Sequence, residues 1–292
     1  MKGRRKDKTV TAVKTLETAK TAIMGVRRIA ALSICAMAAS IAGAATGQPE
    51  ELVPVARLES RSGDRARGAG IFGDHWWANR FLDRHRLVET YRGRVVDLVM
   101  IGDSITHRWE YQHPVNWAKF TSGRAVLNLG YGSDGTQHVM WRIQHGELDG
   151  YEAKAVALLI GVNNNGKAGS DPANVAAAIR KIVQMIRERQ PKARILLHAI
   201  FPVGCSPASG LAACRRRDDE TNRLLKSFAA GDPGIEWIDL ESRFVDATGW
   251  VPKTMMPDEV HPVEAGYDIW AEALSRAIDK PMKGKDENEK RN

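Results

Sequence analysis

The feature that most constrains the fold of this chain is the alternation of short apolar runs with longer amphipathic stretches. Five runs rich in β-branched and aliphatic residues are predicted strands: 95–101, 125–129, 155–160, 194–200 and 235–238. Strands that alternate with helices form βαβ units with right-handed crossovers and parallel strands. The sequence therefore predicts one three-layer α/β domain over residues 71–280, with a parallel sheet covered by helices on both faces.

Two of the predicted helices have clear sequence signals. The stretch 172–189 follows Asp171, a favourable N-cap, and its apolar residues recur at helical spacing. The stretch 262–277 is the last predicted helix. Before the first strand, Trp76 and Trp77 are predicted to cover one face of the sheet, with an exposed sugar-stacking platform as the alternative.

The positive charge of the chain is concentrated at its N-terminus. The formal net charge is +8, and residues 1–47 contain nine of the 43 Lys and Arg but only two of the 35 Asp and Glu. The remaining chain is nearly neutral and has no basic stripe. Nucleic acid is therefore not expected as a partner.

The N-terminus has the layout of a secretory signal peptide. A pair of arginines precedes the uncharged apolar run 29–42, which ends in small residues around Ala44. This run is shorter than the about 20 residues that cross a bilayer, so cleavage near Ala44 is favoured over a transmembrane anchor. We expect a secreted or periplasmic protein without stable membrane insertion after cleavage. The start codon (Met1 or Met24) and the export route stay open.

The flanking segments and the cysteines complete this picture. Residues 45–70 are predicted to be a polar linker, and residues 281–292 a disordered charged tail. Once the signal peptide is removed, Cys205 and Cys214 remain. An even pair in an exported protein predicts a disulfide, with two free thiols as the alternative, and nothing nearby offers the further ligands of a structural zinc site.

Polar motifs follow the predicted strands, where parallel α/β sheets bind their ligands. Gly102-Asp103-Ser104 follows the first strand, and a serine on such a turn is either an exposed nucleophile or a helix N-cap. Residues 128–135 contain the pattern G-x-G-x-x-G. A dinucleotide site needs an acidic residue about 20 residues later, near the end of the next strand, but Gly161-Val162-Asn163 stands there, so no nucleotide cofactor is predicted.

Two further motifs supply the groups that a serine nucleophile needs. Asn163, after the third strand, carries an amide that can donate a hydrogen bond to an oxyanion. Asp258 and His261 stand three residues apart before the last helix, so the carboxylate can accept from one imidazole nitrogen while the other faces a nucleophile. Each signal is modest alone, but together they form a complete set.

These motifs resemble the four blocks of the SGNH (GDSL-like) hydrolases, in order and at suitable spacing. Residues 128–150 and 161–165 are most similar to the branch that contains the catalytic subunits of platelet-activating-factor acetylhydrolase. The resemblance implies a flavodoxin-like, five-stranded α/β/α fold. It also implies serine esterase chemistry without a metal or other cofactor.

The resemblance also implies a role for each residue. Ser104 would be the nucleophile, His261 the general base and Asp258 the group that orients His261. The oxyanion would be held by the backbone N–H of Ser104, the side chain of Asn163 and a backbone N–H at Ser133. Ser133 stands where the family usually has glycine, and its backbone can supply this donor only if its dihedral angles are open to serine.

The sequence thus predicts an exported serine esterase that removes short acyl groups, acetyl above all, from oxygen esters. A small-molecule or glycan ester is the expected substrate, with an acetylated carbohydrate as the first choice. A lipid or lysophospholipid acylhydrolase is one alternative. A glycan-binding module that kept the fold and lost turnover is the other. The sequence leaves the oligomeric state open.

Overall fold

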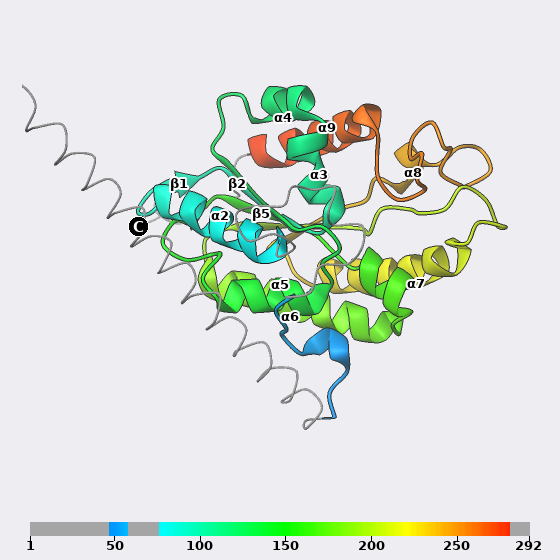
Figure 1. The fold of residues 1–292 in the computed structure, drawn as a ribbon, viewed down its shortest axis with the longest axis horizontal. Helices are drawn as coiled ribbons and strands as arrows, with labels where there is room; N and C mark the ends of the chain where they lie inside the picture. Colours follow the sequence, from blue (N-terminus) through cyan, green and yellow to red (C-terminus); the bar gives the residue numbers. More distant parts are fainter. Residues whose placement is uncertain (1–46, 58–75, 281–292) are drawn as a thin grey trace, which may run out of the picture.

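A computed structural model describes residues 47–57 and 76–280. Its main sheet is parallel and five-stranded (Figure 1). Its spatial order is β3-β2-β5-β6-β7. The strands are β2 (Leu98–Gly102), β3 (Val126–Gly130), β5 (Ala155–Leu159), β6 (Arg194–His198) and β7 (Ile235–Ile238). All five lie within or next to the predicted runs, and the predicted three-layer α/β architecture is confirmed.

The first predicted strand, 95–101, is divided in two by Asp97. Its start is β1 (Val95–Val96), which pairs in parallel with β4 (Glu152–Ala153) in a small separate sheet. Asp97 bends the chain away, because its Oδ2 accepts a hydrogen bond from the backbone of Ala125 at 2.8 Å and its own N–H donates to the Ala125 carbonyl. The sequence run is continuous, but the side-chain bond of Asp97 sends its two parts into different sheets.

Helices cover both faces of the large sheet (Figure 1). One face is covered by α5 (Thr136–Gln144), α6 (Pro172–Arg189) and α7 (Ala212–Ala230), whose apolar residues share a core cluster with the strands. The opposite face is covered by α3 (Ser104–Gln112), α4 (Pro114–Thr121), α8 (Glu241–Phe244) and α9 (Glu264–Asp279). The predicted helix 172–189 matches α6, with Asp171 as its N-cap, and the predicted helix 262–277 begins two residues later in the structure.

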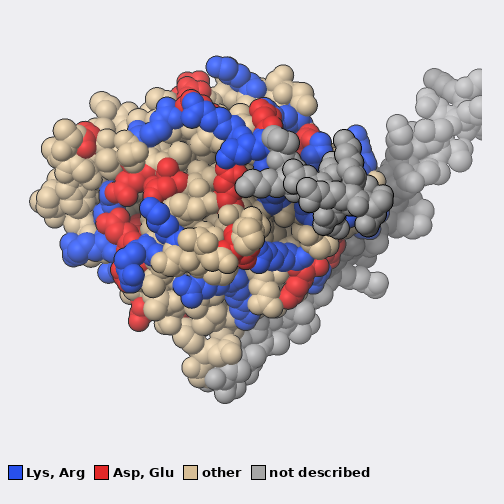
Figure 2. Space-filling model, turned by 180° about the vertical axis from the view of Figure 1, so that it is seen from behind, with Lys and Arg blue, Asp and Glu red and all other residues tan. Residues whose placement is uncertain are grey.

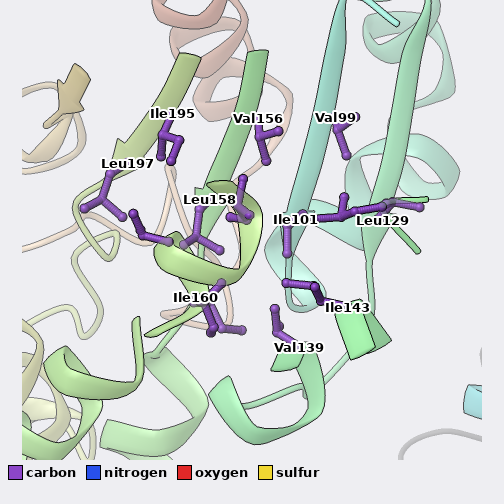
Figure 3. Close-up of a cluster of buried hydrophobic side chains, with 14 of the residues drawn as sticks. Val99, Ile101, Leu129, Val139, Ile143, Val156, Leu158, Ile160, Ile195 and Leu197 are labelled. Atoms are coloured by element: carbon purple, nitrogen blue, oxygen red, sulfur yellow. The ribbon is translucent and has the colours of Figure 1, made fainter. Parts of the chain in front are cut away.

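The central strands β2 and β5 are buried along their whole length, as a parallel sheet between two helical layers requires. Figure 3 shows one of the two cores that flank the sheet, in which Val99, Ile101, Val156 and Leu158 share a cluster with Val139 and Ile143 of α5. The alternate strand residues, such as Leu98 and Met100, face the other core, which is rich in tryptophan. The two-residue period of the strands therefore divides the apolar residues between two separate cores.

The segment before α2 (Trp76–Thr90) departs from the predicted linker. Residues 47–57 lie on the domain and include a short 3₁₀ turn, η1 (Glu50–Leu52), packed against α5 and α6. The backbone carbonyl of Glu51 accepts from the Thr136 hydroxyl at 2.9 Å. The remainder of the predicted linker, the predicted signal peptide and the predicted tail lie outside the described residues. Trp76 and Trp77 are buried, which confirms a packing role.

The surface shows both signs of charge. Figure 2 shows one face of the molecule, on which Lys and Arg side chains lie interspersed with Asp and Glu. Across residues 47–57 and 76–280, no helix has the length and apolar character that a membrane crossing requires.

A buried polar cluster joins α7 to the segment that follows β5. Asp218 on α7 accepts a hydrogen bond from the Asn165 side chain at 2.8 Å and from the Cys214 thiol at 3.5 Å. Burial raises the pKa of Asp218 to about 8, against the opposing effect of these hydrogen bonds. The folded protein therefore keeps this carboxyl protonated at pH values at which the unfolded chain ionises it.

The raised pKa of Asp218 predicts that the stability of the fold depends on pH. Because its folded pKa lies above its unfolded value, its favourable contribution is complete in acid and is lost as the pH rises toward about 8. We expect the free energy of unfolding of the wild type to fall relative to that of Asp218→Asn over this range, as measured by urea denaturation at several pH values. Glu220→Gln, which removes an exposed carboxylate from the same helix, is the control. A difference that does not change with pH would contradict the prediction.

The tryptophan-rich core gives a second stability prediction. Trp270 is buried, stacks on Trp109 at 5.0 Å, and donates a hydrogen bond to His198 Nε2 at 2.9 Å. Trp270→Ala should lower the free energy of unfolding by about 3–5 kcal/mol, because it opens a cavity. Val115→Ala, at a side chain that is 77% exposed on α4, should change it by less than about 0.5 kcal/mol. Equal effects in urea denaturation would refute this account of the core.

Candidate active site

Ser104 occupies the first turn of α3, directly after β2. The side chain of Asp103 caps the helix by accepting from the backbone N–H of Ile105 at 2.9 Å, so aspartate rather than Ser104 provides the cap. The side chain of Ser104 is thereby left for another partner, although the residue is only 5% exposed. The N-terminal end of a helix also favours negative charge at this position.

Close approach of β2, β3 and α3 requires glycine at two strand ends. A Cβ at Gly130 would lie 2.5 Å from the backbone nitrogen of His107, and one at Gly102 would lie 2.6 Å from the carbonyl oxygen of Leu159. Neither gap can hold a side chain. The glycines therefore allow the loop after β3 to lie against the turn that carries Ser104.

Ser104, His261 and Asp258 form one chain of hydrogen bonds. Ser104 Oγ lies 2.8 Å from His261 Nε2, and His261 Nδ1 lies 2.7 Å from Asp258 Oδ2. Asp258 Oδ1 also accepts the backbone N–H groups of His261 at 2.8 Å and Val260 at 3.2 Å. The three residues that the motifs predicted are thus brought together across 157 residues of chain.

Asp258 is ionised in this arrangement. Partial burial would raise its pKa, but hydrogen bonds from the side chain and backbone of His261 outweigh that effect and hold the pKa of Asp258 well below its usual range. Arg108, one turn after Ser104 on α3, also donates from Nη1 to Asp258 Oδ2 at 3.3 Å. Sequence reasoning missed Arg108, and its only signal was the four-residue spacing from Ser104 on a helix.

Glu259, which follows Asp258, holds the turn that carries Asp258 and His261. Glu259 has a φ of 64°, which is uncommon for a residue with a side chain. Its carboxylate accepts from the Cys205 thiol at 3.1 Å and from the Ser209 hydroxyl, and its carbonyl accepts from Gly204 N–H at 3.0 Å. These hydrogen bonds from the loop 204–209 therefore hold the turn that carries Asp258 and His261.

The predicted disulfide between Cys205 and Cys214 is wrong: both are free thiols. Cys205 donates to Glu259, whereas Cys214 is buried on α7 and donates to Asp218 at 3.5 Å. Each sulfur is thus turned toward its own carboxyl partner. The hydrogen bond to Glu259 raises the pKa of Cys205, and burial raises that of Cys214.

Ser133 lies in the loop after β3 with a φ of 62°. This is the left-handed region, which costs a residue with a Cβ about 1–2 kcal/mol and costs glycine nothing. Ser133 therefore adopts the left-handed conformation at a free-energy cost that glycine would avoid. The preceding residue, Gly132, donates its N–H to His107 Nδ1 at 3.3 Å and accepts from Arg57 Nη1 at 2.7 Å through its carbonyl.

Asn163 is attached to the same loop. Its side-chain Nδ2 donates to the carbonyl of Asp134, the residue after Ser133, at 2.9 Å. The following residue, Asn164, accepts from the backbone N–H of Thr136 at 3.0 Å and begins a π-helical turn. Two of the three predicted oxyanion residues, Ser133 and Asn163, are therefore connected through Asp134. Nδ2 carries a second hydrogen that the Asp134 contact does not use.

A buried charge cluster supports this loop, and sequence reasoning missed it. Asp134 accepts from Trp77 Nε1 at 2.7 Å and from Arg142 Nε at 3.0 Å, and Arg142 also pairs with Glu147. Burial raises the pKa of Asp134 to about 6, against the opposing charge of Arg142. The guanidinium of Arg142 lies 3.9 Å from the centre of the Tyr131 ring. Buried arginine side chains thus hold the residues on both sides of Ser133: Arg57 binds Gly132, and Arg142 binds Asp134.

Within the described residues, no three His, Cys, Asp or Glu side chains are grouped as metal ligands.

The comparisons with known proteins agree with this geometry. A model of the GDSL-like lipase/acylhydrolase family matches residues 100–269. Human platelet-activating factor acetylhydrolase IB subunit alpha1 is 33% identical over 207 residues, which cover 70% of this chain and 83% of that relative.

Two solved structures show the same fold. A GDSL-like lipase from Bacteroides thetaiotaomicron has a TM-score of 0.55 at 16% identity and covers 69% of this chain and 100% of its own. An acetylxylan esterase from Geobacillus stearothermophilus, solved as a catalytic mutant, has a TM-score of 0.51 at 20% identity and covers 65% of this chain and 96% of its own. The chain belongs to the GDSL-like lipase/acylhydrolase family and is a carboxylic ester hydrolase.

Proposed function

We propose that this protein is a serine esterase that removes short acyl groups, acetyl above all, from oxygen esters through an acyl-enzyme. The observation that carries the proposal is the hydrogen-bonded chain from Ser104 through His261 to Asp258. In such a chain the nucleophile, its base and the group that orients the base are already in place before substrate binds.

The proposed acylation step uses the hydrogen bond between Ser104 and His261. His261 Nε2 takes the proton of the Ser104 hydroxyl while Oγ bonds to the ester carbonyl carbon, whose oxygen becomes an oxyanion. The backbone N–H groups of Ser104 and Ser133 and the side-chain amide of Asn163 are the proposed donors to that oxyanion. Nε2 then returns the proton to the leaving alcohol oxygen as the ester C–O bond breaks, and Ser104 keeps the acyl group.

Deacylation repeats the same steps with water. His261 Nε2 accepts a proton from water as its oxygen bonds to the acyl carbon, and returns that proton to Ser104 Oγ as the acid leaves. Asp258 stays ionised throughout, holds the proton on His261 Nδ1 and stabilises the imidazolium. Arg108 donates a second hydrogen bond to the same carboxylate oxygen, Asp258 Oδ2.

The nucleophile can be tested with p-nitrophenyl esters and the purified protein. Wild type should hydrolyse p-nitrophenyl acetate, with kcat/KM falling as the acyl chain is lengthened. Ser104→Ala should lower kcat by at least about 10³-fold, because the remaining oxyanion donors cannot form an acyl-enzyme. Ser227→Ala, at an exposed position on α7, is the matched control. Full activity of Ser104→Ala would exclude the proposed nucleophile.

An acetylated carbohydrate is the proposed substrate class. The acetylxylan esterase that shares this fold supports it. So does the proposed export of the chain, which rests on the signal-peptide pattern of residues 1–44 and would place the enzyme among extracellular polysaccharides. A lipid acetyl ester is the second candidate, because the relatives at 33% identity are named platelet-activating factor acetylhydrolases.

A substrate comparison separates these classes. We expect acetate release from acetylated xylan and xylo-oligosaccharides to exceed release from an sn-2 acetyl ether phospholipid by at least about tenfold in kcat/KM, a difference of about 1.4 kcal/mol in transition-state stabilisation. Acetate is measured enzymatically, with Ser104→Ala as the blank. The reverse preference would assign the enzyme to lipids. Binding of xylan without any ester hydrolysis would favour a glycan-binding module.

A further inference from the structure

The segment before the family-matched region reaches the proposed oxyanion loop. Residues 47–57 lie outside the region 100–269 that the family model matches, yet they dock on α5 and α6. The N–H of Val55 donates to the Gln137 carbonyl at 3.2 Å, and Lys181 Nζ donates to the Leu52 carbonyl at 3.2 Å. This docking brings the buried side chain of Arg57 to the loop after β3.

Arg57 donates a hydrogen bond to one peptide group of that loop. Its charge also opposes the effect of burial on Asp134, two residues further on, by lowering the pKa of that carboxyl. Its Nη1 donates to the carbonyl oxygen of Gly132 at 2.7 Å, and its guanidinium lies 5.8 Å from the centre of the Trp76 ring. The carbonyl of Gly132 and the N–H of Ser133 belong to the same planar trans peptide, so they point in opposite directions. A donor that fixes the Gly132 oxygen therefore also fixes the direction of the Ser133 N–H.

The backbone conformation of Ser133 explains why this peptide needs to be held. Reversal of the Gly132–Ser133 peptide would turn the Ser133 N–H away from its present direction. It would also change the φ of Ser133 from its present 62° to a negative value, which residues with a Cβ prefer. Serine thus favours the reversed peptide, whereas glycine would be nearly indifferent. The hydrogen bond from Arg57 opposes the reversal.

We propose that Arg57 is a positioning residue for the oxyanion hole: it holds the Gly132–Ser133 peptide so that the Ser133 N–H faces the reacting ester. This inference rests on the proposed function, because it assigns Arg57 a task in that reaction. The charged donor also polarises the amide that it binds, which strengthens the Ser133 N–H as a donor.

The kinetic test uses Arg57→Met and p-nitrophenyl acetate with the purified protein. We expect kcat to fall about 10- to 100-fold with little change in KM, because an oxyanion donor acts in the transition state and its loss costs about 10²- to 10³-fold. Arg57→Lys should lie between wild type and Arg57→Met, since lysine keeps the charge on a different geometry. Unchanged kcat in a folded Arg57→Met protein would overturn the proposal.

Two further variants distinguish positioning from a general structural role. Lys181→Met loosens the same docked segment without touching Gly132, and should keep kcat within about twofold of wild type. In a Ser133→Gly background, Arg57→Met should cost about threefold or less relative to Ser133→Gly alone, because glycine no longer favours the reversed peptide. An equal loss in both backgrounds would show that Arg57 does not act through this peptide.

A crystal structure of Arg57→Met separates this inference from the proposed function. We expect the Gly132–Ser133 peptide to be reversed, with a negative φ at Ser133. If wild type hydrolysed no ester, the proposed function would fail, and the orientation of this peptide would still decide whether Arg57 holds it. An unreversed peptide would refute the inference whatever the activity.

Discussion

The site depends on the alignment of three adjacent parallel strands. Strand β2 lies between β3 and β5, and Ser104, Ser133 and Asn163 follow these three strands. Parallel strands place their carboxyl ends at one edge of a sheet, so segments far apart in sequence meet there. Asp258 and His261 come from the loop before α9. Helix α9 is held to α3 by the hydrogen bond from the Tyr267 hydroxyl to the Ile105 carbonyl at 2.8 Å.

Buried polar groups hold the loops at this edge, where the apolar cores end. Asp134, in the loop after β3, is paired with Arg142 on α5, and Asn165, in the segment after β5, is hydrogen-bonded to Asp218 on α7. A buried charge or amide is costly unless it is bonded, so each such group specifies one loop position strongly. The left-handed conformation of Ser133 persists because contacts on both sides of it, including that of Arg57 with Gly132, define the loop.

Much of the fold could be predicted because its signals are local. The five strands follow from short apolar runs rich in β-branched and aliphatic residues, and the helix from Pro172 to Arg189 follows from the helical spacing of its apolar residues. The break at Asp97 could not be predicted, because it depends on a bond to Ala125, 28 residues away. The docking of residues 47–57 also escaped sequence reasoning, since these residues bind mainly through backbone groups that no side-chain pattern reveals.

The sequence by itself determined the fold class and predicted that Ser104, Asp258 and His261 meet, because apolar runs, helical spacing and short motifs are local features of the chain. The tertiary structure decided which distant groups meet. It brings Arg57 within hydrogen-bond distance of Gly132, and Arg108 within hydrogen-bond distance of Asp258. It also pairs each of the two cysteines with a carboxyl group rather than with the other cysteine. These pairings depend on the three-dimensional approach of separate elements, which chain position alone does not encode.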